Sequence, residues 1–262
     1  MRVGYKLASI LMVLFLVLTF SFELIATENV QINLSAKEII KKMDDGMRGT
    51  TSYAVYTMKI TNPKWQRTLK MKNWSEGEDK SFILVEYPPK EKGITYLKIK
   101  NEMWNYLPSV ERIIKIPPSM MMQSWMGSDF TNDDLVKQSS VVDDYVQTRL
   151  EDETYQNRNA YVLKLVAKPE AAVTWGLIKI WIDQEYFMPL KEEFYDEKNE
   201  LINVMYFENH QMVGARWFPS RWRMVPQKKP GHETQIELSE IVFDGPLPAD
   251  LFTQSALKRF SR

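Results

Sequence analysis

The sequence predicts a mainly β protein, with ten to twelve antiparallel strands in one curved sheet and a few helices against its concave face. Apolar and polar residues alternate with a period of two over most of the chain after residue 54, which is typical of half-buried strands. One segment near the start has helical spacing instead, and no long linker or internal repeat divides the chain. These patterns together indicate one large β domain that is partly covered by helices.

The first 26 residues have the features of a secretory signal peptide. Arg2 and Lys6 give a positive start, an uncharged run of sixteen residues follows, and Ala26 is a small residue suited to cleavage. We therefore expect a signal peptide over 1–26 and an exported domain over 27–262. An uncleaved membrane anchor stays open as the alternative, although the run is shorter than the roughly 20 apolar residues of a spanning helix.

Composition excludes several classes of function. The 262 residues include no cysteine, which rules out disulfides, thiolate metal sites and a cysteine nucleophile. Basic and acidic side chains number 34 each, so no positive excess exists to attract nucleic acid. The motifs of nucleotide, dinucleotide and serine-hydrolase sites do not occur, so we expect no cofactor.

A helix is expected over 36–47. Ser35 and Glu38 have the spacing of a capping box, in which the two side chains satisfy two free backbone amides. Apolar residues then follow at helical spacing, namely Ile39, Ile40, Met43 and Met47. The segment is therefore an amphipathic helix with one face available to cover the sheet.

Short strands with tight connections are expected over 54–116. The apolar run at 82–85 is continuous, which indicates a strand covered on both faces. After an interruption, strands resume at about 145–152, 159–167, 177–183, 190–195, 201–207, 217–225 and 234–243. In the last of these, apolar residues change from even to odd positions, so we expect a β-bulge near Ser239 or Glu240. A closing helical turn is expected over 246–252.

The interruption at 117–136 is rich in methionine. Its apolar, deformable side chains are Met120, Met121, Met122, Trp125 and Met126. Exposed methionine clusters are common at adaptable hydrophobic binding surfaces, so the segment favours a carrier of apolar cargo over an enzyme. The alternative, that these methionines only fill a gap in the core, stays open. A short helix is expected at 132–137, capped by Thr131 or Asn132.

Candidates for catalysis or metal binding are few. The chain has two histidines, His210 and His232, and neither has a second histidine at metal-ligand spacing. The acidic pairs at 133–134 and 143–144 match no calcium loop, so we expect solvated charge there and no metal site. An enzyme is the least favoured class, since only a serine or threonine beside one of the histidines would supply a nucleophile–base pair. The eight tryptophans either fill the core or line an apolar trough.

Several segments resemble the LolA-like outer-membrane lipoprotein-sorting proteins of the bacterial periplasm. The likeness covers nearly the whole mature chain and lies in 35–40 (SAKEII), 127–135 (GSDFTNDDL), 162–165 (VLKL), 180–183 (IWID), 188–190 (MPL), 217–221 (WFPSR) and 247–253 (LPADLFT). The resemblance implies an unclosed β-barrel of about eleven antiparallel strands, with helices forming a lid over an apolar cavity. It also implies a monomeric periplasmic carrier that takes lipoprotein acyl chains or other lipids to a membrane partner.

The lid is expected to comprise the 36–47 helix and the 118–136 segment. Candidates for the cavity and lid are Ile39, Ile40, Met43, Met58, Trp65, Leu69, Trp104, Met121, Met122, Trp125, Met126, Phe130 and Trp181. In the sorting proteins an arginine of an early strand holds the lid closed, and Arg67 is the candidate here. Each buried CH₂ contributes roughly 0.8 kcal/mol, so release of an acyl chain needs direct transfer to a partner with an apolar site.

Two functions follow from these expectations. The first is a carrier that receives lipid at the inner membrane, from a transporter there, and delivers it to an outer-membrane acceptor. The second is an accessory subunit of an inner-membrane lipid or hydrophobe transporter, docked through the methionine-rich loop. Loss of transporter association on deletion of 118–126, with lipid uptake intact, distinguishes the second function from the first.

Overall fold

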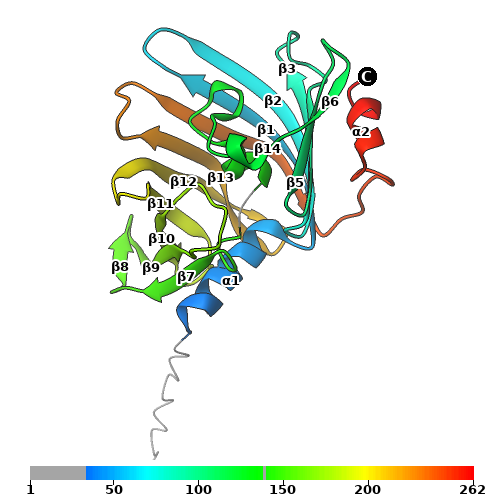
Figure 1. The fold of residues 1–262 in the computed structure, drawn as a ribbon. Helices are drawn as coiled ribbons and strands as arrows, with labels where there is room; N and C mark the ends of the chain where they lie inside the picture. The colour runs from blue at the N-terminus through cyan, green and yellow to red at the C-terminus, as the bar shows by residue number, and fades with distance from the viewer. Residues whose placement is uncertain (1–33, 138–139) are drawn as a thin grey trace, which may run out of the picture. The chain divides into compact units, whose positions relative to one another are not determined.

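One antiparallel sheet of fourteen strands dominates the computed structural model, which describes residues 34–137 and 140–262 (Figure 1). The strands are β1 (Thr51–Thr61), β2 (Gln66–Glu76), β3 (Lys80–Tyr87), β4 (Thr95–Ile99), β5 (Glu102–Leu107), β6 (Arg112–Lys115), β7 (Tyr145–Arg149), β8 (Glu153–Tyr155), β9 (Arg158–Ala167), β10 (Leu177–Asp183), β11 (Pro189–Tyr195), β12 (Leu201–Val213), β13 (Arg216–Pro226) and β14 (Glu233–Phe243). Their order is β6-β5-β4-β3-β2-β1-β14-β13-β12-β11-β10-β9-β7, with β8 paired to β9. Within the described residues β6 and β7 do not pair, so the sheet is not closed into a barrel.

The mainly β class and the curved, unclosed sheet are therefore confirmed. The number of strands is fourteen, whereas the resemblance implied about eleven. Part of the difference comes from β8, which has three residues and is too short to display an alternating pattern. The predicted signal peptide over 1–26 lies outside the described residues. Among the helices that the structure does describe, none combines the length and apolar character needed to cross a bilayer.

The helix α1 (Ala36–Arg48) confirms the predicted amphipathic helix. The Ser35 hydroxyl accepts from the Glu38 amide at 3.3 Å, and the Glu38 carboxylate accepts from the Ser35 amide at 2.8 Å. Ile39 and Ile40 are fully buried in the core that the helix shares with the sheet. The helix ends at Gly49, whose φ of 68° favours a residue without a Cβ. Local sequence thus sets both ends of this element, and packing sets which face is covered.

Replacing Ser35 with alanine should lower the free energy of unfolding by about 1 kcal/mol, because the Glu38 amide at the start of α1 loses the Ser35 hydroxyl as its acceptor. Ser35→Asp restores an acceptor for the Glu38 amide and should stay close to the wild-type stability. Urea denaturation of both variants measures the difference. An equal loss in the two variants would show that capping does not stabilise α1.

The predicted β-bulge in β14 is also confirmed. Val55 of β1 pairs with Glu240, while the next residue, Tyr56, pairs with Leu238. Ser239 is therefore the extra residue, and it shifts the alternation of β14 by one position. Because of the bulge, apolar residues at even positions before it and at odd positions after it share one face of the strand.

The two faces of the sheet are covered by different parts of the chain. The concave face carries the largest apolar cluster, which includes residues of α1 and of the segment between β6 and β7. That segment contains η1 (Pro118–Met120), η2 (Trp125–Gly127) and η3 (Asp133–Lys137). The short helix expected at 132–137 is confirmed as the π-helical turn η3, whose start Thr131 caps by accepting from the Asp134 amide at 3.1 Å. Figure 1 shows α1 and this segment on the inner side of the curved sheet.

The chain end covers the opposite face near β2–β5. There the helix α2 (Gln254–Arg259) packs Ala256 and Leu257 against Phe82 and Leu97. Residues 82–85 alternate between this cluster and the concave one, so the strand is covered on both faces as predicted. The helical turn expected over 246–252 is wrong, because the helix begins after Thr253, whose side chain accepts from the Ala256 amide at 3.2 Å.

Candidate functional site

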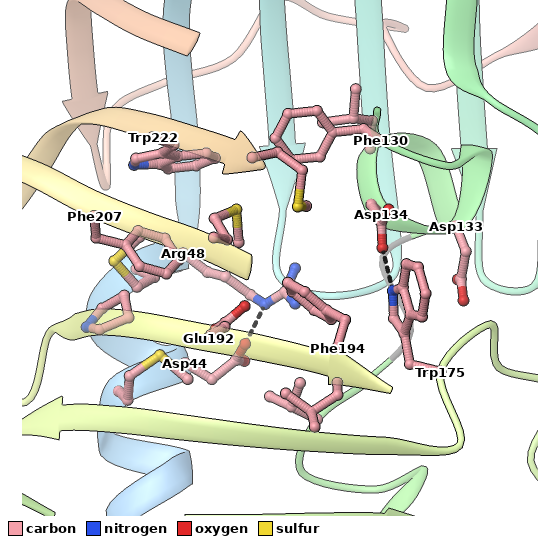
Figure 2. A pocket seen from close by; sticks show the side chains of 18 of the residues that line it. Asp44, Arg48, Phe130, Asp133, Asp134, Trp175, Glu192, Phe194, Phe207 and Trp222 are labelled. Carbon is pink, nitrogen blue, oxygen red and sulfur yellow. Dashed lines mark hydrogen bonds and ion pairs between the residues drawn. The ribbon is translucent and has the colours of Figure 1, made fainter. Parts of the chain in front are cut away.

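A cavity of about 240 Å³ lies between α1, the η2–η3 region and the concave face of the sheet (Figure 2). Most of its wall is apolar, formed by Met43, Met47, Phe130, Phe194, Phe207 and Trp222. Because side chains alternate along a strand, the residues contributed by β11, β12 and β13 share the concave face of the sheet. The volume is below the 300–1,000 Å³ typical of small-molecule pockets, so a long acyl chain needs more room than this conformation provides.

Aromatic rings form two sides of the cavity. The Phe207 and Trp222 ring centroids are 6.0 Å apart at an interplanar angle of 64°, in an edge-to-face arrangement. On another side, the Trp175 and Phe194 ring centroids are 5.2 Å apart. Such ring pairs present rigid apolar surface and add to the stability that area burial provides. The wall is therefore preformed by the sheet, while the opposite side consists of α1 and the η2–η3 region.

Carboxyl groups interrupt this apolar wall. The Asp44 carboxylate pairs with the Arg48 guanidinium at 2.7 Å within α1. Asp133 accepts from the Thr174 amide at 3.0 Å, and Asp134 accepts from Trp175 Nε1 at 2.8 Å. Burial raises the pKa of Asp134 to about 6, although its hydrogen bonds stabilise the charged form and act to lower that pKa. These bonds join η3 to the loop before β10 and close one end of the cavity.

Glu192 differs from the other cavity carboxyls because no hydrogen bond or ion pair joins its side chain to the described residues. It lies on β11, where its neighbours across the sheet are Ile180 and Met205. Its side chain points into the cavity (Figure 2). Burial raises the pKa of Glu192 to about 8, with a smaller contribution from the charge of Asp134. A carboxyl group thus occupies an inward position where its neighbours on the same face are apolar.

Residues 127–130 (GSDF) attach the 118–136 segment to the sheet. The Ser128 hydroxyl donates to the Trp125 carbonyl at 2.8 Å. The Asp129 amide donates to Thr234 Oγ1 at 2.9 Å, and that hydroxyl donates to the Asp129 carboxylate at 2.7 Å. Thr234 is fully buried on β14. These bonds explain why serine and aspartate occur together here, since each satisfies backbone or hydroxyl groups that packing removes from water.

Arg67 contacts the same region from β2. Its Nη1 donates to the Met126 carbonyl at 2.9 Å, and its Nη2 forms an ion pair with Glu91. Met126 has a φ of 50°, a left-handed conformation that is uncommon for a residue with a side chain. Arg67 therefore ties an irregular turn of the 118–136 segment to the sheet, and its role as a latch stays a prediction.

The structure separates the predicted cavity and lid residues into four groups. Met43 and Phe130 border the cavity. The concave core contains Ile39, Ile40, Met58, Leu69, Met121 and Trp125, with Met126 packed against it. Trp65 and Met122 are 44% and 68% exposed. Trp104 and Trp181 belong to separate clusters on the other face of the sheet.

The methionine-rich loop combines both roles that its sequence left open. Met121 is buried in the concave core, whereas Met120 and Met122 are exposed. The sequence pattern does not identify Glu192, because Lys191, Glu192 and Glu193 form a charged run that gives no alternation. In the part of the chain that the structure describes, no group of three or more His, Asp or Glu side chains is placed to hold a metal ion.

Comparisons with known proteins agree with this fold. A family model described as "Uncharacterized protein" matches residues 77–259, which is more than half of the chain. A Vibrio parahaemolyticus domain named for outer membrane lipoprotein sorting has 24% identity and a TM-score of 0.76, covering 86% of this chain and 98% of that one. A DUF1329 family protein from Desulfovibrio piger has 23% identity and a TM-score of 0.78, covering 85% and 97%. A LolA superfamily protein from Nitrosomonas europaea has 23% identity and a TM-score of 0.74, covering 85% and 99%.

These matches establish a LolA-like fold for most of the chain. The chain belongs to the family that this model describes, and the LolA-like resemblance seen in its sequence is confirmed at the level of the fold. None of the curated proteins compared with the chain matches it.

Proposed function

We propose that this protein is an exported periplasmic carrier that binds acyl chains of lipoproteins or other lipids, without catalysis, as a monomer. The observation that carries the proposal is the apolar cavity between a preformed sheet and a separate covering segment. The features of a signal peptide in the first 26 residues support export. Cargo passes from an inner-membrane donor to an outer-membrane acceptor, because an acyl chain does not return to water at a useful rate.

The size of the cavity sets a condition on this function. Transfer of each CH₂ from water contributes roughly 0.8 kcal/mol, so a chain of 14–16 carbons has on the order of 10 kcal/mol available before costs. A volume of about 240 Å³ does not hold such a chain entirely. The lid, consisting of α1 and 118–136, therefore moves away from the sheet when cargo enters. This movement of the lid exposes apolar surface that the cargo then covers.

The carrier proposal is tested by narrowing the cavity. Met205 borders the cavity, and Met205→Trp should reduce binding of a brominated acyl chain at least tenfold, measured by quenching of tryptophan emission. Met212→Trp makes the same change at an exposed position and should leave binding unchanged. Mass spectrometry of lipids extracted from protein purified without detergent should identify bound acyl chains. Absence of both quenching and extracted lipid would contradict the proposal.

Arg67 acts as the latch of this lid in our proposal. Arg67→Met should speed amide hydrogen exchange over 120–131 by about tenfold, because the Met126 carbonyl and the Glu91 carboxylate lose their partner. Arg112 is exposed on β6, so Arg112→Met serves as the control. Hydrogen exchange followed by mass spectrometry measures the effect by segment. Unchanged exchange over 120–131 in Arg67→Met would show that Arg67 does not hold the lid.

The accessory-subunit function has one specific observation in its favour. Met120 and Met122 present exposed apolar surface at the lid, with Met122 68% exposed. Replacing both with serine leaves the buried Trp125 in place, which deletion of 118–126 does not. If docking to a membrane transporter is the function, the double variant loses co-purification with that transporter and keeps acyl-chain binding. Under the carrier proposal alone, acyl-chain binding is the property on which activity depends.

A further inference from the structure

We infer that the cavity selects a cargo with a cationic amine attached to its apolar body, and that Glu192 is the residue that recognises the amine. This inference rests on the proposed carrier function and specifies the chemical class of the cargo. It is carried by the placement of one unpaired carboxyl group in an otherwise apolar part of the cavity. The charges of the groups around that carboxyl determine which sign of head group the cavity accepts.

The position of Glu192 is unusual for a sheet residue facing a core. Its cross-strand neighbours Ile180 and Met205 and the next inward residue of its own strand, Phe194, are apolar. Polar residues at core-facing positions oppose folding, so they are expected mainly where a function requires them. The carboxyl group lies deep in the protein, so the surface that it keeps accessible faces the cavity. A ligand in the cavity can therefore reach this group directly.

The other charged groups of the cavity favour a cation. Within the part of the lining that the structure describes, four residues carry carboxyl groups, Asp44, Asp133, Asp134 and Glu192, and one, Arg48, carries a guanidinium. Arg48 is paired with Asp44 at 2.7 Å, so among the described lining residues a phosphate or carboxylate head group finds no uncommitted cation. Asp134 is held by Trp175 and Thr131, whereas Glu192 has no partner among the described residues. Glu192 is thus the carboxyl group that is available to a ligand.

An ammonium group satisfies the requirements of this site better than a hydroxyl group. A charge in a low-dielectric cavity is stable only when it is paired and hydrogen-bonded, and an ammonium supplies both to a carboxylate. Burial keeps the empty site largely protonated near neutral pH. Binding of an ammonium therefore displaces the proton from the Glu192 carboxyl into solvent, and the ion pair takes its place. The other titratable groups that line the cavity are Asp44 and Arg48 on α1, Asp133 and Asp134 on η3, Tyr56 on β1 and Tyr145 on β7. Of these, the charge of Asp134 adds to the raised pKa of Glu192.

Three probes with the same ten-carbon chain test the inference: decylammonium, decanol and decanoate. Isothermal titration calorimetry of the full chain at pH 7 should give at least tenfold tighter binding of decylammonium than of decanol, with decanoate weakest. Repeating the titration in buffers of different ionisation enthalpy should show release of about one proton with decylammonium and none with decanol. The proton count needs no variant, so it tests the role of a protonated carboxyl directly.

A matched pair of variants assigns the effect to Glu192. Glu192→Gln keeps the shape of the side chain and should remove both the preference for decylammonium and the proton release, with decanol affinity unchanged. Glu170 is exposed, so Glu170→Gln removes the same charge elsewhere and should behave as wild type. Equal binding of the three probes, or a preference that survives in Glu192→Gln, overturns this inference while the carrier function stands. Failure of all three probes to bind overturns the carrier function and this inference with it.

Discussion

Replacing Trp125 with alanine should lower the free energy of unfolding by about 3–5 kcal/mol, the range for large aromatic residues removed from a packed core. Trp125 is 1% exposed, although it belongs to an irregular loop between β6 and β7. Its ring packs against Tyr96 with centroids 5.5 Å apart, which joins the loop to the concave face of the sheet. Loss of the ring leaves a void that the surrounding strands do not fill.

Trp65→Ala provides the comparison for Trp125→Ala. Trp65 is 44% exposed, so the same substitution there should change the free energy of unfolding far less, by about 1 kcal/mol or less. Urea denaturation followed by circular dichroism measures both variants. Similar losses in the two variants would mean that the 118–136 segment contributes little to the core. A large loss confined to Trp125 would show that the lid is part of the folded core in the unloaded protein.

Replacing Glu192 with glutamine should stabilise the protein, and the gain should grow with pH. The pKa of Glu192 is about 8 in the folded chain, above the ordinary value of 4.5. The folded state therefore holds a proton that the unfolded state releases, so this group costs stability as pH rises from 4.5 to 8. Each pKa unit corresponds to about 1.4 kcal/mol, so the gain on substitution should reach roughly 3–4 kcal/mol at pH 8 and vanish near pH 4.

The measurement is the melting temperature of both proteins between pH 4 and pH 8. With about 2–4 °C per kcal/mol for a domain of this size, Glu192→Gln should melt roughly 10 °C higher than wild type at pH 8. Glu170→Gln, at an exposed position, should follow the wild-type curve at every pH. A pH-independent difference would show that Glu192 is ionised in the folded protein. A stabilising substitution at this position is the expected sign of a residue kept for binding.

Much of the fold follows from patterns that are local in sequence. The capping box of α1 and the parity change in β14 each involve a few neighbouring residues, and both predictions are confirmed. The short strand β8 and the start of α2 after Thr253 were not predicted correctly, because three residues carry no period and prolines obscure the helix start. Errors of this kind change the number and limits of elements and leave the architecture intact.

The candidate site is less accessible from sequence. Trp104 and Trp181 are aromatic and buried like Trp125, yet they belong to clusters on the other face of the sheet. Nothing in the type of residue separates these cases, since burial on either face requires the same apolar side chain. Which face a residue occupies depends on strand register, and each bulge changes that register for all later residues. A list of tryptophans and methionines therefore mixes cavity, core and outer surface.

The sequence alone predicted the LolA-like fold, the covering helix and the methionine-rich segment, because periodicity and short motifs are encoded in adjacent residues. The assembled sheet was needed to bring β11, β12 and β13 around one cavity and to place Glu192 within it. That placement arises from the pairing of β11 with its neighbouring strands, together with the burial of the Glu192 carboxyl group by residues of other elements. From sequence alone, a charged run such as Lys191, Glu192 and Glu193 is expected to face solvent. The strands paired on either side show which of its residues points inward.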